Sequence, residues 1–108
     1  MDIISLFRSM LTEKASDLYL TGGKKPMYRV PGKLRQAADT VIEDEDIQAF
    51  INEWLPPETV ARFKAERDLD IGVSLSETER YRLHLGYEKN RSSMVVRRVP
   101  SGALSMKE

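Results

Sequence analysis

The 108-residue sequence contains no cysteine and only one histidine. Without cysteine there is no disulfide framework, no thiolate nucleophile and no cysteine-ligated metal site, which fits a reducing compartment. One histidine and no cysteine also leave no Ser-His-Asp or Cys-His set for nucleophilic catalysis. The histidine, His84, has no ligand-type pattern around it. A lone histidine of this kind is far more often a surface residue than a metal ligand.

Net charge is absent as well, since 17 basic residues balance 17 acidic ones. A balanced chain has no global field that would recruit nucleic acid or an anionic membrane. No apolar run approaches the ~20 residues needed to span a bilayer, and the N-terminus lacks the basic start and continuous apolar core of a signal peptide. The 41% hydrophobic and 31% charged residues that are present indicate one folded globular domain rather than a disordered segment.

Three segments have the apolar spacing of amphipathic helices. In residues 2–14 the apolar positions recur at i, i+3, i+4, i+7 and i+8, behind Asp2, which is a suitable N-cap. Residues 42–55 carry a second stripe, with acids in the first turn, where negative charge favours the helix macrodipole. Pro56 ends this helix, and Pro57 suits the first position of a third helix that continues to residue 67.

Short segments with the period of β-strands lie between and after these helices. Pro31 and Gly32 predict a turn between two of the strands. The last three strands form a meander, and the expected strands cover residues 18–21, 27–30, 33–35, 69–75, 80–87 and 92–99. Helices packed on one face of an antiparallel sheet make an α+β two-layer domain. The main core candidates are Phe7, Ile47, Phe50, Trp54, Phe63, Leu83 and Leu85.

Residues 80–100 gather six basic side chains against one acid, Glu88, although the chain is neutral. Period two places Arg80 and Arg82 on the polar face of one strand. Arg97 lies near the end of the returning strand, and Arg91 lies at the turn.

Two interpretations of these arginines stay open on spacing alone. The arginines can form a solvated face with screened ion pairs to residues 39–58, which hold seven acids and no base; each such pair is worth ~0–1 kcal/mol. Alternatively they form an anion site, for phosphate, because the guanidinium fork matches phosphate oxygens.

Two other patterns are set aside. The run "EDED" lacks the alternating ligands, the central glycine and the closing glutamate of a calcium loop, so a solvated acidic helix start is expected there. The run "GGKK" is not a phosphate loop, which needs two glycines at a wider spacing before Lys-Ser or Lys-Thr.

Three stretches together resemble a known family. "KASDLYLTGGKKPMYRVPGKLR", "DLDIGVSL" and "RYRLHLGYEKNRSSMVVRRVPS", in this order and spacing, are similar to the N-terminal domain of type IV pilus retraction ATPases, the twitching-motility members of the type II/IV secretion ATPase superfamily. The similarity covers nearly all of residues 1–104. It departs from the family pattern at Tyr19, Pro31, His84 and Gly86.

The resemblance implies a PAS-like N-terminal domain over residues 1–99, with residues 100–108 starting a linker to a RecA-like ATPase domain that is absent here. It implies a cytoplasmic homohexamer, associated with the inner membrane through the pilus machinery, that hydrolyses ATP with Mg²⁺ to withdraw pilin. The domain's partners would be the RecA-like domains of its own and the neighbouring subunit. The 108 residues alone, without Walker motifs, are expected to be inactive and to bind no cofactor tightly.

The resemblance also implies roles for individual arginines. Arg82, Arg97 and Arg91 match the positions at which arginines of the family's N-terminal domain reach the nucleotide phosphates, while Arg80 matches without a clear role. The alternative function is a stand-alone PAS-like module for ligand sensing or protein interaction. Nucleic-acid binding is not expected, because Tyr81 and Tyr87 share the apolar face of their strand and are more suited to a core than to base stacking.

Overall fold

The computed structural model describes residues 2–99, and the expected linker at 100–108 lies outside the described residues. The elements follow in the order α1 (Ile3–Glu13), β1 (Asp17–Thr21), β2 (Met27–Val30), β3 (Lys33–Gln36), α2 (Asp44–Trp54), α3 (Pro57–Glu66), β4 (Leu69–Ser76), β5 (Glu79–Glu88) and β6 (Arg91–Val99). Each helix and strand expected from the periodicity is confirmed, with ends that differ by at most two residues.

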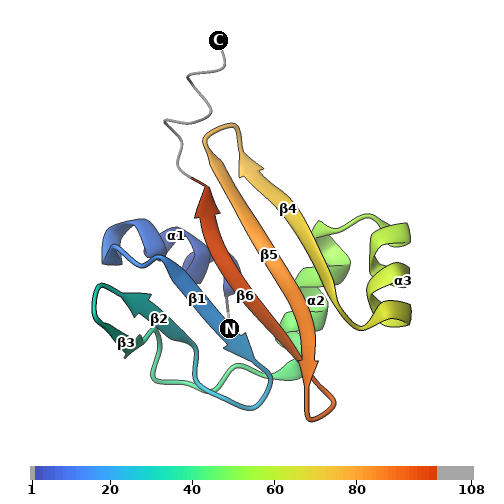
Figure 1. The fold of residues 1–108 in the computed structure, drawn as a ribbon, viewed down its shortest axis with the longest axis horizontal. Helices are drawn as coiled ribbons and strands as arrows, with labels where there is room; N and C mark the ends of the chain where they lie inside the picture. Colours follow the sequence, from blue (N-terminus) through green and yellow to red (C-terminus); the bar gives the residue numbers. More distant parts are fainter. Residues whose placement is uncertain (1, 100–108) are drawn as a thin grey trace.

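All six described strands join one antiparallel sheet with the order β3-β2-β1-β6-β5-β4. Two meanders, β1-β2-β3 and β4-β5-β6, are therefore joined by the antiparallel pairing of β1 with β6, in which Asp17 lies opposite Arg97. The helices pack on this sheet, and Figure 1 shows α2 passing behind the strands while α3 lies beside the β4 edge. The α+β two-layer prediction is confirmed.

The helix boundaries have local causes. Asp2 caps α1, since its carboxylate accepts hydrogen bonds from the backbone N–H and the hydroxyl of Ser5. This contact also lowers the pKa of Asp2. Pro57 begins α3 as expected, and Gly32 has a φ of +81° in the turn after β2.

The core lies between the helices and one face of the sheet. Phe7 of α1 is fully buried at its centre, 5.1 Å from the Phe50 ring of α2 and 4.9 Å from the Tyr81 ring of β5, measured between ring centroids. These tilted aromatic pairs tie both helices to the sheet. The prediction of the core is confirmed for Phe7, Ile47, Phe50, Phe63, Leu83 and Leu85. For Trp54 it is only partly right, because this side chain is half-buried at the core's margin.

Tyr81 and Tyr87 face the helices, as their strand position predicted. The Tyr81 hydroxyl donates to the backbone carbonyl of Phe7 at 3.3 Å, and burial raises the pKa of Tyr81. Tyr87 is stacked between the ring of Phe63, 5.0 Å away, and the guanidinium of Arg67. Neither ring is presented on the sheet's open face, which is the face turned away from the helices.

Candidate anion-binding site on the open face of the sheet

A row of charged side chains crosses the open face of the sheet. Strand register places Arg29 of β2 opposite Asp17 of β1, Asp17 opposite Arg97 of β6, and Arg97 opposite Arg82 of β5. The same row ends at Gly72 of β4. Because strand side chains alternate between faces, these positions all point away from the helices.

Asp17 organises one half of this row. It is only 4% exposed and accepts hydrogen bonds from Arg97 Nε at 3.0 Å and from the Ser16 hydroxyl at 2.9 Å. Arg29 Nε lies 3.9 Å from the other carboxylate oxygen and donates to the Tyr19 hydroxyl at 2.9 Å. That bond to Tyr19 raises the pKa of Arg29. Asp17 thus anchors Arg97, whose guanidinium remains largely exposed.

Arg82 has no such anchor. It is exposed, and within residues 2–99 its side chain has no hydrogen bond or ion pair. Its direct cross-strand neighbour is Arg97, and like charges in that relationship are destabilising. An anion placed between the two guanidinium groups would relieve this repulsion and would meet two planar donor forks.

The space around Arg82 is open on both sides. A hollow of about 400 Å³ extends from Arg82 past Arg80 to Gly72, and one of about 140 Å³ separates Arg82 from Arg97 and His84. Gly72 has no side chain to fill the position across from Arg82, and a Cβ built there would meet no heavy atom closer than 3.9 Å. A glycine inside a strand often marks a close approach of this kind.

The acids at the start of β4 do not pair with Arg82. Asp70 and Asp68 instead hold His84, with carboxylate oxygens 3.0 Å from Nδ1 and 3.0 Å from Nε2, respectively. Arg80 donates to the Ser74 hydroxyl at 3.1 Å. Neither Arg82 nor Arg97 pairs with an acid of residues 39–58 in the described structure, so the first interpretation of the arginines, screened pairing with that segment, does not describe these two residues.

Arg91 is separate from the pair. It faces Glu88 at the β5–β6 turn, six residues along β6 from Arg97, which corresponds to about 20 Å of strand. Its guanidinium lies over Gly23 and donates to the Gly22 carbonyl at 3.4 Å. The structure therefore brings Arg82 and Arg97 together and places Arg91 at the opposite end of the sheet.

Sequence reasoning missed Asp17 and Gly72 as parts of the site. An aspartate at the start of an apolar strand was a signal for Asp17, because a carboxylate that is buried there needs a partner. A glycine within the alternating run of β4 was the signal for Gly72. The signal for Asp17 does not identify Arg97, since β1 and β6 are far apart in the sequence. The predicted meander brings β4 beside β5, but it does not give the register that places Gly72 opposite Arg82.

Within residues 2–99 no group of three His, Asp or Glu side chains is placed to hold a metal ion. None of the helices in that range is long and apolar enough to cross a membrane.

Comparison with known proteins identifies relatives along the whole chain, although no protein-family model matches. The chain is 28% identical over 108 residues to the type IV pilus retraction ATPase PilT of Pseudomonas aeruginosa, and 23% identical to the type IV pilus ATPase PilU of the same organism. It covers 31% and 28% of these two proteins, so it spans less than a third of either.

Solved structures share the fold. A crystal structure of the pilus retraction motor PilT with bound ADP aligns with a TM-score of 0.82 and 19% identity, over 93% of this chain and 29% of that one. The Legionella pneumophila ATPase DotB aligns with a TM-score of 0.77 and 16% identity, over 91% of this chain and 29% of the other. The described fold is that of the N-terminal domain of PilT.

Proposed function

From the homology of this chain to the type IV pilus ATPases PilT and PilU, we propose that it is the N-terminal domain of a hexameric ATPase motor that powers pilus retraction in twitching motility. In this proposal the domain has a PAS-like fold and works in the cytoplasm, against the inner-membrane pilus machinery. It contacts the RecA-like domains of its own and the neighbouring subunit. ATP and Mg²⁺ are bound mainly by those domains, which lie outside these 108 residues.

The observation that carries the proposal is the pairing of Arg82 with Arg97. Two guanidinium groups stand in register on an exposed face, and only one of them has an acidic partner. Arg82 and Arg97 would contact the phosphates of a nucleotide held by the adjoining domain. Positive charge fixed in this way stabilises the charge that develops during phosphoryl transfer.

The anchoring of Arg97 gives the two arginines different tasks. Asp17 holds Arg97 in place before any ligand arrives, so its donors are preorganised. Arg82 is free to move toward the phosphate. Arg91 lies about 20 Å away along the sheet, so it cannot share one phosphate group with the pair, and we propose that any nucleotide contact it makes is made separately.

The test uses a full-length ATPase that carries this domain. Arg82→Ala should reduce ATP turnover by ~10³-fold, as loss of a transition-state arginine does in other ATPases. Arg80→Ala is the matched control, because Arg80 lies two residues away on the same face, and this variant should keep a turnover close to that of the parent. Arg82→Lys keeps the charge but loses the fork, so it should be nearly as impaired as Arg82→Ala.

Equal turnover in the parent, Arg82→Ala and Arg80→Ala proteins would show that the arginines form only a solvated face. The 108-residue chain alone should bind ATP poorly, because it lacks the backbone N–H groups of a phosphate loop. Calorimetry on this chain separates the motor domain from a stand-alone ligand sensor. A sensor would bind its small ligand unaided.

A further inference from the structure

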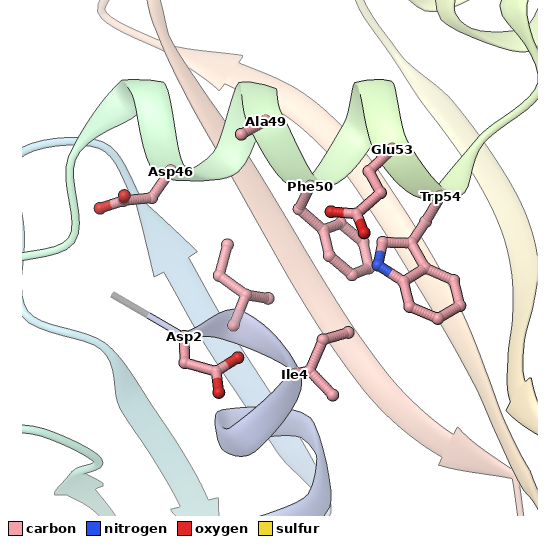
Figure 2. A pocket seen from close by; sticks show the side chains of 8 residues that line it. Asp2, Ile4, Asp46, Ala49, Phe50, Glu53 and Trp54 are labelled. Atoms are coloured by element: carbon pink, nitrogen blue, oxygen red, sulfur yellow. The ribbon is translucent and has the colours of Figure 1, made fainter.

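A groove on the helical side of the molecule is not used by the arginine pair. It lies between the first turn of α1 and the length of α2, with a volume of about 170 Å³. Figure 2 shows its walls, with Asp2 and Ile4 on α1 and Asp46, Phe50, Glu53 and Trp54 on α2. It lies on the helix-covered side of the sheet, whereas the row that contains Arg82 is on the open face.

Trp54 forms the apolar wall of this groove. The other apolar residues of the same stripe, Ile47, Phe50, Ile51 and Leu55, are buried, but Trp54 is half-buried. Its ring stacks on Phe50, with centroids 6.1 Å apart and planes inclined by 24°. One side of the indole is therefore fixed against the core while part of it remains available in the groove.

Among residues 2–99, the rim of the groove carries carboxylates and no basic side chain. Asp2 and Asp46 both accept backbone hydrogen bonds in caps, from Ser5 and Glu43 respectively, so their positions are set by the helices. Glu53 is exposed and has no hydrogen bond or ion pair within residues 2–99. Its carboxylate lies beside the Trp54 indole in Figure 2. No lysine, arginine or histidine lines the groove.

We propose that this groove docks a lysine or arginine side chain presented by a partner protein. The cation would lie against the Trp54 ring, whose negative face attracts positive charge, and would pair with Glu53. The aliphatic stem of such a side chain would cover the apolar floor at Phe50 and Ile4. Tryptophan is among the residues that contribute most to binding in protein interfaces, because it buries a large area with few rotamers.

The experiment uses the 108-residue chain and two acetylated, amidated tetrapeptides. One contains arginine beside leucine, and the other has neutral citrulline in place of the arginine. The indole N–H signal of Trp54, the chain's only tryptophan, is followed by NMR. We expect a saturable shift with the arginine peptide and about tenfold weaker binding of the citrulline peptide.

Two variants locate the charge. Glu53→Gln should weaken binding of the arginine peptide, while the remaining attraction to the Trp54 ring should keep this binding tighter than that of the citrulline peptide. Glu45→Gln, an exposed acid of α2 outside the groove, should leave it unchanged. Equal binding of the two peptides would identify a purely apolar groove and overturn the proposal. The absence of any shift at Trp54, or an equal loss in the two variants, would overturn it as well.

Discussion

Arg82 and Arg97 face each other across β5 and β6, yet only Arg97 is bonded to a carboxylate. Two residues of the same type, on the same face and in the same row, therefore differ in what they do for the fold. Arg97 donates a hydrogen bond to the buried carboxylate of Asp17. The side chain of Arg82 has no hydrogen-bond partner in the described structure, and its charge repels that of Arg97.

This difference predicts unequal effects on stability. Arg97→Ala should lower the free energy of unfolding by about 1–2 kcal/mol, because it removes the closest charged donor of a buried carboxylate. Arg82→Ala should change it by less than ~0.5 kcal/mol, with relief of the like-charge contact as the only term. Urea denaturation of the 108-residue chain measures both. Equal losses in the two variants would mean that Asp17 is satisfied without Arg97.

The predicted loss of stability in Arg97→Ala affects how a loss of ATP turnover in this variant is interpreted. In a full-length ATPase that carries this domain, Arg97→Ala can lower turnover because the domain is destabilised, whereas Arg82→Ala removes only the guanidinium itself. Arg82 is therefore the residue on which the phosphate-contact hypothesis is best judged.

Two glycines with positive φ allow a matched test of the Arg91 contact. Gly23 and Gly32 have φ values of +87° and +81°. A Cβ on Gly23 would lie 1.7 Å from Arg91 Nη1, whereas a Cβ on Gly32 would meet nothing within 4 Å. Gly32→Ala should cost ~1–2 kcal/mol from the left-handed backbone alone. Gly23→Ala should cost more, because the Arg91 guanidinium must also move.

The double variant Gly23→Ala, Arg91→Ala removes the steric clash and leaves the backbone cost. Its free energy of unfolding, compared with that of Arg91→Ala alone, should show a loss close to that of Gly32→Ala. A Gly23→Ala loss no larger than the Gly32→Ala loss would show that Arg91 leaves its place over Gly23 without cost.

The ion pair between Arg8 and Glu79 predicts a pH dependence. Arg8 Nε and Nη2 lie 2.8 Å and 3.2 Å from the two carboxylate oxygens, which joins α1 to β5. These hydrogen bonds from Arg8 hold the pKa of Glu79 below its ordinary value of 4.5. A carboxylate with a lowered pKa contributes stability that is complete above its ordinary pKa and is lost as the pH falls through the lowered one.

Glu79→Gln should therefore reduce stability at neutral pH and should flatten the decline of the urea midpoint below pH 4.5. Glu77→Gln serves as control, because Glu77 is an exposed neighbour without a hydrogen bond or ion pair in the described residues. If the two variants have the same pH profile, the pair with Arg8 contributes nothing measurable.

Trp54 and Phe7 should differ in their effect on stability. Phe7→Ala removes a fully buried ring and should cost ~3–5 kcal/mol. Trp54→Ala removes a ring that is only half-buried, so the loss should be smaller, about 1–2 kcal/mol. Urea denaturation measures both, and a Trp54→Ala loss equal to that of Phe7→Ala would place Trp54 in the core after all.

The helices and strands of this fold could be predicted from the sequence because the signals that specify them lie within a few residues of one another. The stripe through Phe7, the proline at position 57 and the alternation from Arg80 to Tyr87 each act within a few residues, and each is found as expected. Arg82 and Arg97 could be placed on polar strand faces for the same reason.

The site itself depends on pairings that sequence periodicity does not contain. Alternation places Arg97 on one face of its strand but does not show that β6 lies beside β1, so the hydrogen bond from Arg97 to Asp17 could not be predicted. Gly72 is a different case: the meander predicts that β4 lies beside β5, but the periodicity does not give the register that places Gly72 opposite Arg82. The partial exposure of Trp54 was not predicted, because an apolar stripe shows only toward which side of the helix a side chain points. It does not show that α1, which contributes Ile3 and Ile4 to the groove beside Trp54, leaves part of the indole exposed.

The pairing of β1 with β6 also constrains how the domain is made. Asp17 and Arg97 are 80 positions apart and lie in the central strand pair of the sheet. Closing so long a loop costs chain entropy before any contact repays it, which slows folding. During synthesis the edge of β1 that pairs with β6 has no partner until β6 has left the ribosome. This domain therefore folds after its own translation is finished, and its first meander is the part that needs protection from other chains until then.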